Sequence, residues 1–142
     1  IEMGVEDYLI NSAVIGLLAQ RILRKNCPFC SEPDHPPELA IEEYRILEIA
    51  GKHRALMPPE GVVFRRGKGC SMCAQTGYRG RIAVFELLEY TDELKEVFLK
   101  KMSLDAMREV LMKNKNYRVL REDGMLKVAK GLTTIEEVLR VT

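Results

Sequence analysis

Two C-x-x-C motifs constrain this chain more than any other feature of its sequence. Cys27 and Cys30 form the first motif, Cys70 and Cys73 form the second, and 39 residues lie between them. A C-x-x-C turn directs two sulfurs toward one point, and two such turns supply the four thiolates of a tetrahedral zinc site. The sequence therefore predicts that these four cysteines bind one structural zinc ion.

Other uses of the cysteines stay open at this point. A thioredoxin-like redox pair would need a strand before and a helix after one motif, and it would leave the second motif unexplained. Structural disulfides suit a secreted domain, but the chain carries no export signal. His35 could replace one sulfur, although the polar turn SEPDHPP also suits an exposed histidine and four thiolates already suffice. We therefore favour zinc bound by four cysteines.

Length and charge limit the remaining possibilities. The 142 residues suffice for one compact domain or two small ones. There are 22 Lys and Arg residues against 21 Asp and Glu residues, so the net charge of +1 gives no global field that attracts nucleic acid or anionic lipid. The most apolar stretch, AVIGLLA at 13–19, is too short to span a bilayer. We expect a cytoplasmic chain, and its first residue, isoleucine, suggests a piece of a longer protein.

Residue patterns in the first two thirds predict both helices and strands. The apolar spacing at 8–25, with Val14, Leu17, Leu18 and Ile22 on one stripe, predicts a helix. A second helix is predicted for 38–50. It follows Pro36 and Pro37, buries Ala40, Tyr44 and Leu47, and stops at Gly51. The β-branched and aromatic residues at 61–64 and 81–89 predict a small antiparallel ribbon beside the second C-x-x-C motif.

Only helical patterns follow Tyr90. Thr91 and Ser103 are expected N-caps of two helices, the first of which ends at Met102. A third helical pattern covers 117–130, and Thr134 with Glu137 forms a capping box for the last helix. The fold class is therefore α+β: a tetracysteine element with a small antiparallel ribbon, followed by an all-helical C-terminal subdomain.

No catalytic motif accompanies these elements. The nearest approach to a phosphate-binding loop is GVVFRRGKG, but five residues separate Gly61 from Gly67 and no Ser or Thr follows Lys68. We assign no catalytic or nucleotide-binding residue, and we expect His53, in the charged turn GKHR, to be exposed.

Three ordered motifs resemble one known family. DYLINSAVIGLLAQRILRKNCPFC, GCSMCAQTGYRGRIAVFELL and DGMLKVAKGLTTIEEVLRVT look like the C-terminal region of the traffic ATPases of type II secretion and type IV pilus assembly, the GspE/PilB-like family. The resemblance covers nearly the whole chain. It implies that residues 1–26 form the C-terminal edge of a RecA-like ATPase domain, that 27–89 form the tetracysteine zinc element, and that 90–142 form the helical subdomain.

The resemblance also implies the function of a parent protein. That protein would be a hexameric ATPase on the cytoplasmic face of the inner membrane, using ATP and Mg²⁺ to drive protein export or pilus assembly. Its expected partners are inner-membrane apparatus proteins, the rest of the ATPase and neighbouring subunits. This chain alone, which lacks a Walker A loop, is expected to be inactive and monomeric.

Basic residues leave two questions open. By resemblance to the family, Arg21 and Arg24 could face nucleotide or a neighbouring subunit. The simpler interpretation is that they are exposed arginines at the end of a helix, where the helix dipole favours them. Five more basic residues surround the second C-x-x-C motif and could meet acidic lipid head groups or a membrane partner: Arg65, Arg66, Lys68, Arg79 and Arg81. The alternative function, a zinc-ribbon module that binds nucleic acid, would use this cluster, but it lacks an aromatic platform and a strong basic balance. We therefore expect no nucleic-acid partner.

Overall fold

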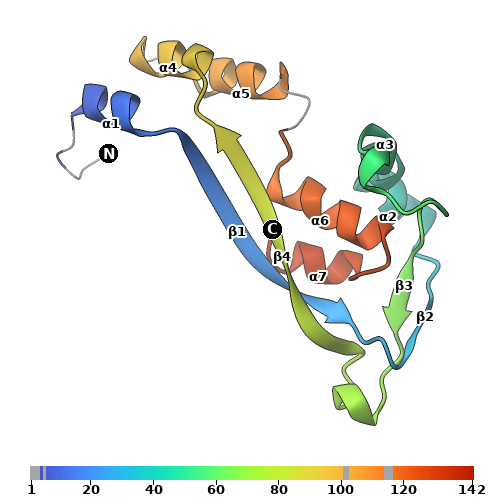
Figure 1. Cartoon of the computed structure of the whole chain (residues 1–142). Coiled ribbons are helices and arrows are strands. Elements are labelled where there is room, and N and C mark those ends of the chain that lie inside the picture. The colour runs from blue at the N-terminus through green and yellow to red at the C-terminus, as the bar shows by residue number, and fades with distance from the viewer. Residues whose placement is uncertain (1–3, 5, 101–102, 114–116) are drawn as a thin grey trace. The chain divides into compact units, whose positions relative to one another are not determined.

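The computed structural model describes residues 4, 6–100, 103–113 and 117–142 (Figure 1). Packing divides the chain into two compact units, residues 1–19 with 86–118 and residues 20–85 with 119–142. The boundaries of these units differ from those of the three expected parts, 1–26, 27–89 and 90–142. The assignment of those parts as domains of a parent protein stays a prediction. None of the helices in the described residues combines the length and apolar character needed to cross a bilayer.

The strands form two small sheets. Strand β1 (Gly16–Asn26) pairs with β4 (Tyr78–Glu89), and Figure 1 shows the two running in opposite directions. Strand β2 (Ser31–Pro33) pairs antiparallel with β3 (Arg65–Gly67), with Glu32 opposite Arg66. The predicted α+β class with a small antiparallel sheet is confirmed. The pairing differs from the prediction, however, because residues 61–64 form no strand and β4 pairs with β1 instead.

The helix predicted at 8–25 is wrong over most of its length. Helix α1 covers only Asp7–Ala13, and the chain is extended from Gly16 as β1. The expected buried stripe is exposed at Leu17, Leu18 and Ile22, whereas Leu23 is fully buried. Pairing with β4 supplies backbone hydrogen bonds along the strand, and this tertiary contact overrides a local apolar pattern that fits a helix equally well.

The helix predicted at 38–50 is broken in two. Helix α2 (Glu38–Glu43) ends at Tyr44, and α3 (Ile46–Lys52) begins after Arg45, whose φ of 51° is left-handed. A left-handed residue ends an α-helix and turns the next one onto a different face. Ile46 is consequently buried where the prediction placed Leu47, and Gly51 lies inside α3 rather than stopping it.

The core of the unit formed by residues 20–85 and 119–142 lies around α6 (Leu120–Ala129). Helix α3 packs on one part of α6 and α7 (Ile135–Leu139) on another. Gly124 permits the approach of α7, because a Cβ atom there would lie 2.6 Å from the Val138 side chain. The fully or nearly fully buried members of this core are Leu23, Ile46, Ala50, Val84, Met125, Val128, Ala129, Ile135 and Val138.

The described residues of the unit formed by residues 1–19 and 86–118 include α1, α4 (Asp92–Leu99) and α5 (Leu104–Lys113) beside parts of β1 and β4. Helix α4 packs against α1 and α5. The predicted caps are confirmed: the Thr91 hydroxyl accepts from the Leu94 amide and the Ser103 hydroxyl from the Ala106 amide. The expected end of the first helix, Lys101 and Met102, lies outside the described residues.

Candidate metal centre

The first C-x-x-C motif lies in the turn between β1 and β2. The strand end is fixed by Asn26, whose amide N–H donates to the Leu132 carbonyl at 2.9 Å and whose side chain donates to the carbonyls of Arg65 and Gly131. The next amide, of Cys27, donates to the Gly77 carbonyl at 2.8 Å. The first motif is therefore tied directly to the second.

The second motif lies in the turn between β3 and β4 and contains the short 3₁₀ helix η2 (Ser71–Cys73). Its return passes Gly77, where φ is 75° and a Cβ atom would lie 2.3 Å from the Gly67 carbonyl oxygen. A side chain at Gly77 would therefore be both strained and in collision with the backbone of β3. This close approach closes the second C-x-x-C turn on itself.

The four cysteine sulfurs lie within 4.8 Å of one another. The Cys27 and Cys70 sulfurs are 3.9 Å apart, those of Cys30 and Cys73 also 3.9 Å, and those of Cys70 and Cys73 3.7 Å. A zinc ion with sulfurs about 2.3 Å away would set them about 3.8 Å apart in a tetrahedron. These sulfur–sulfur distances also far exceed the length of a disulfide bond, about 2.05 Å, and all four thiols are free.

The electrostatics of this cluster fit a bound cation. Burial raises the pKa of the Cys30 thiol to about 12. Burial acts in the same direction on Cys73, but amide N–H groups of Cys70 and Gly77 donate to its sulfur at 3.2 and 3.3 Å and lower its pKa to about 6. Four adjacent thiols cannot all ionise unless a positive charge lies among them. A divalent, thiolate-preferring metal ion suits this donor set.

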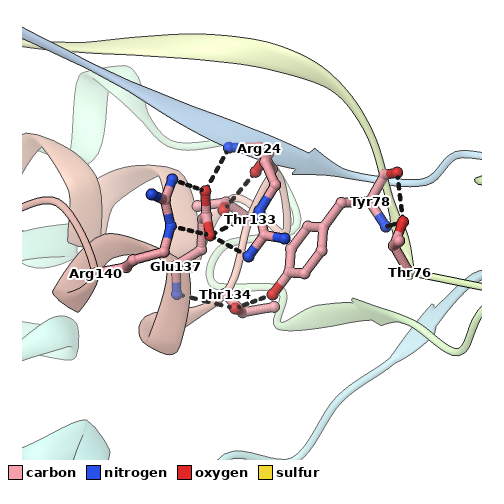
Figure 2. Close-up of polar contacts among 7 residues, drawn as sticks. All are labelled: Arg24, Thr76, Tyr78, Thr133, Thr134, Glu137 and Arg140. Carbon is pink, nitrogen blue, oxygen red and sulfur yellow. Dashed lines mark hydrogen bonds and ion pairs between the residues drawn. The ribbon is translucent and has the colours of Figure 1, made fainter.

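A network of polar side chains lies beside the second motif and joins it to α7 (Figure 2). The Thr76 hydroxyl donates to the Cys73 carbonyl at 2.6 Å and accepts from the Tyr78 amide at 3.3 Å. The Tyr78 hydroxyl shares a 2.8 Å hydrogen bond with that of Thr134, which also accepts the Glu137 amide. Thr134 is thus the N-cap of the last helix, as predicted.

Glu137 is the centre of this network rather than the second half of a capping box. Its side chain is 0% exposed, and its two oxygens accept five hydrogen bonds from Arg24 and Arg140. Burial alone would raise the pKa of Glu137, but the two guanidinium groups lower it to about 2. Figure 2 shows both arginines directed at this carboxylate, and the Arg24 guanidinium also lies 4.3 Å from the centroid of the Tyr78 ring.

Sequence reasoning missed this network. It considered Arg24 for a nucleotide or a neighbouring subunit, whereas the structure pairs Arg24 with a residue 113 positions away. Arg21 is exposed, and its guanidinium donates to the carbonyl of the adjacent Gln20. The Glu137 and Arg140 pair, three residues apart on a helix, is the one local signal that could have indicated an ion pair there.

Four of the five basic residues around the second motif have a partner within the chain. Arg65 donates to the hydroxyl and carbonyl oxygens of Ser31. Arg66 forms ion pairs with Asp34 and Glu136, and the Lys68 ammonium lies 3.5 Å from Glu32. Arg79 donates to the Met72 carbonyl, and Arg81 is exposed.

The two histidines lie apart from the sulfur cluster. His35 is exposed and does not belong to the group of four possible metal ligands found in the described residues. The prediction of an exposed His53 is wrong: only 9% of this residue is accessible, and its imidazole lies 3.4 Å from Glu122. The break between α2 and α3 causes this difference, because it turns the end of α3 toward α6.

Comparison with known proteins matches one family over almost the full chain. The family described as "Type II/IV secretion system protein" matches residues 1–140. The chain is 36% identical over 146 residues to the type IV pilus assembly ATPase PilB of Thermus thermophilus, which covers 99% of the chain. It is also 36% identical to type II secretion system protein E of Pseudomonas aeruginosa over 143 residues and to type II secretion system ATPase E of Vibrio cholerae over 141 residues, covering 100% and 99% of the chain.

The chain spans only part of these relatives. It covers 15% of the length of the Thermus protein and 26% of the length of each of the other two.

Proposed function

Because this chain belongs to the type II/IV secretion system protein family, we propose that it forms the metal-binding and helical C-terminal part of a hexameric traffic ATPase. The parent ATPase hydrolyses ATP with Mg²⁺ at the cytoplasmic face of the inner membrane and powers type II secretion or type IV pilus assembly. Its partners are neighbouring subunits and inner-membrane apparatus proteins. The chain's role is to couple the ATPase to those partners.

The sulfur cluster carries this proposal. Cys27, Cys30, Cys70 and Cys73 hold one structural zinc ion, and three of these residues are buried. The spacing of the sulfurs and the N–H donors that favour a thiolate at Cys73 support this assignment. Bound zinc supplies a cross-link between the two C-x-x-C turns.

The residues around the cluster can transmit force from the turns to the last helix. The chain of contacts passes from Cys73 through Thr76, Tyr78 and Thr134 to Glu137. Because a hydrogen bond joins each of these groups to the next, a displacement of the turns is passed to α7 through direct contacts. A rigid coupling element suits a motor whose partners lie outside its catalytic core.

Metal analysis of the purified chain tests the assignment. We expect one zinc ion per chain, retained in reducing buffer, and loss of the metal in Cys70→Ser, since three thiolates bind zinc less tightly than four. The variant Ser71→Ala changes the adjacent exposed residue and should keep the metal. A folded, reduced chain with a zinc content near zero would contradict the proposal.

ATP hydrolysis tests the division of labour between the chain and its parent. We expect no ATPase activity from these residues alone, because their sequence contains no phosphate-binding loop. The full-length parent should hydrolyse ATP in the same assay. Activity that stays with the chain through repeated purification would show that the catalytic residues lie in this part.

Nucleic-acid binding is less well supported. A nucleic-acid-binding surface uses cations that are free to contact phosphate groups. Arg65, Arg66 and Lys68 instead contact Ser31, Asp34, Glu136 and Glu32 within the chain.

A further inference from the structure

Helices α2 and α7 border a pocket of about 270 Å³ whose walls are mostly apolar. Ala40 of α2 and its C-cap Tyr44 line one side, and Ile135 and Leu139 of α7 line the other. Residues four positions apart lie on one face of a helix, so each helix presents one face to the pocket. We refer to it as the α2–α7 pocket, and its apolar lining also includes Phe64 and Val128.

The two cations that line the α2–α7 pocket already have partners. Arg65 donates to the hydroxyl and carbonyl oxygens of Ser31. Arg66 forms ion pairs with Asp34 at 3.4 Å and with Glu136 at 2.8 Å. A ligand that carries a phosphate or a carboxylate would therefore have to compete with these contacts.

The α2 side of the pocket is strongly acidic. Residues 32–48 contain six Asp and Glu side chains and one Arg, a net charge of −5, whereas the whole chain has a net charge of +1. Glu38, Glu42 and Glu43 of α2 are exposed, and none of the three forms an ion pair with another residue that the structure describes. These carboxylates give the rim of the pocket a negative potential, which attracts cationic groups.

We propose that the α2–α7 pocket receives one large apolar side chain from a basic segment of a partner protein. Its volume lies just below the roughly 300–1,000 Å³ of pockets that enclose whole small-molecule ligands, and it suits a single anchoring side chain of a protein interface. Lys and Arg residues on either side of that anchor meet the carboxylates of α2. This inference rests on the proposed function, because it specifies the chemistry of one partner to which the chain couples the ATPase.

Titration of the zinc-loaded full chain with short peptides, followed through the NMR signals of its backbone amides, tests the inference. The probe is acetyl-GKKFKKG-amide, in which lysines flank one phenylalanine. We expect saturable shifts at the amides of Ala40, Ile135 and Leu139. The peptide acetyl-GKKAKKG-amide lacks the anchor and should bind about tenfold more weakly. The peptide acetyl-GEEFEEG-amide should cause no shifts, because the carboxylates of α2 repel it.

Two substitutions separate the apolar part of the site from the charged part. Ala40→Leu fills the pocket and should weaken binding of the phenylalanine peptide about tenfold. Glu42→Gln removes one exposed carboxylate and should weaken binding about threefold. This second variant keeps the test informative if Ala40→Leu does not fold. The matched controls are Leu39→Ala, at an α2 site that is 79% exposed, and Glu109→Gln, at an exposed site on α5, and both should bind like the wild type.

Several results would overturn the inference. A folded, zinc-loaded chain that shows no shifts with the basic peptide would do so, as would equal binding of the acidic peptide or wild-type affinity in Ala40→Leu. Shifts of the pocket amides that grow with chain concentration in the absence of peptide would assign the pocket to a second copy of the chain instead. None of these results affects the proposed function, which the zinc content and the ATPase activity of the parent test separately.

Discussion

Glu137 shows how a single buried charge can hold distant parts of the chain together. Its carboxylate has no exposed side-chain surface and depends on Arg24 of β1 and Arg140, the C-cap residue of α7, for all five of its hydrogen bonds. A buried charge of this kind is tolerated only when it is fully paired. The arginines are about half exposed, so water supports them if the carboxylate is removed.

Glu137→Gln is expected to destabilise the fold by about 3 kcal/mol near neutral pH. The folded pKa of about 2 lies below the ordinary value for glutamate, so the charged form stabilises the fold above that ordinary value. This contribution is lost as the pH falls from about 4.3 toward about 2. Urea denaturation at several pH values measures this contribution. The difference in free energy of unfolding between the wild type and Glu137→Gln should narrow across that pH interval.

Glu136→Gln is the matched control for this prediction. Glu136 is the neighbouring residue, but its side chain is 66% exposed and pairs with Arg66 at the surface. Surface pairs contribute about 0–1 kcal/mol, so this variant should resemble the wild type. Equal effects of the two substitutions would show that Glu137 is not the buried centre of the network.

The sequence predicted that the four cysteines lie together, but it did not predict the polar network, because the two kinds of information differ in range. Each C-x-x-C motif is a local pattern with a known chemical use, and two of them imply one site. The pairing of Arg24 with Glu137 depends on how β1 lies against α7, and nothing in the nearby residues encodes it. Glu137 also fits a capping box, and that local interpretation concealed its role.

Helices α2 and α3 allow a direct test of where the chain breaks. A continuous helix buries Leu47, whereas a break at Arg45 buries Ile46 and leaves Leu47 58% exposed. Ile46→Ala should therefore cost about 2–5 kcal/mol of stability, and Leu47→Ala, a surface change, about 0.5 kcal/mol. Thermal or urea unfolding of the two variants measures this contrast. A larger loss of stability for Leu47→Ala than for Ile46→Ala would indicate a continuous helix instead.

Strand β1 is the element whose type the residue pattern predicted wrongly. Its residues repeat with a spacing that suits a helix, and the structure instead pairs them with β4. Gly16 agrees with this pairing, since a Cβ atom there would lie 3.0 Å from the Leu88 carbonyl oxygen. Helices α4, α5 and α7 were predictable because Thr91, Ser103 and Thr134 give local start signals, which do not depend on a distant partner.

The division of the whole molecule follows packing rather than sequence order. Helices α6 and α7 belong to the unit that contains the sulfur cluster, whereas α4 and α5 belong to the other. The Asn26 amide binds the Leu132 carbonyl, and the Val63 amide binds the Ala129 carbonyl. The segments that lead to the cluster are thus hydrogen-bonded to α6 and to the loop between α6 and α7, and the metal is expected to stabilise more than the 27–89 segment.

Removal of the metal is therefore expected to loosen one unit and spare the other. Structural zinc contributes on the order of 10 kcal/mol to the folding of small elements, which is comparable to the whole stability of an ordinary domain. Chelation should speed amide exchange at Gly77, at Val63 and also at Val138 in α7, while Val97 in α4 keeps its protection. Hydrogen-exchange mass spectrometry with and without chelator measures this, and re-added zinc should restore the slow exchange. If exchange instead rises uniformly at Val97 and Val138, the two units unfold as one; if Val138 stays protected while Gly77 is lost, the metal supports only the turns that bind it.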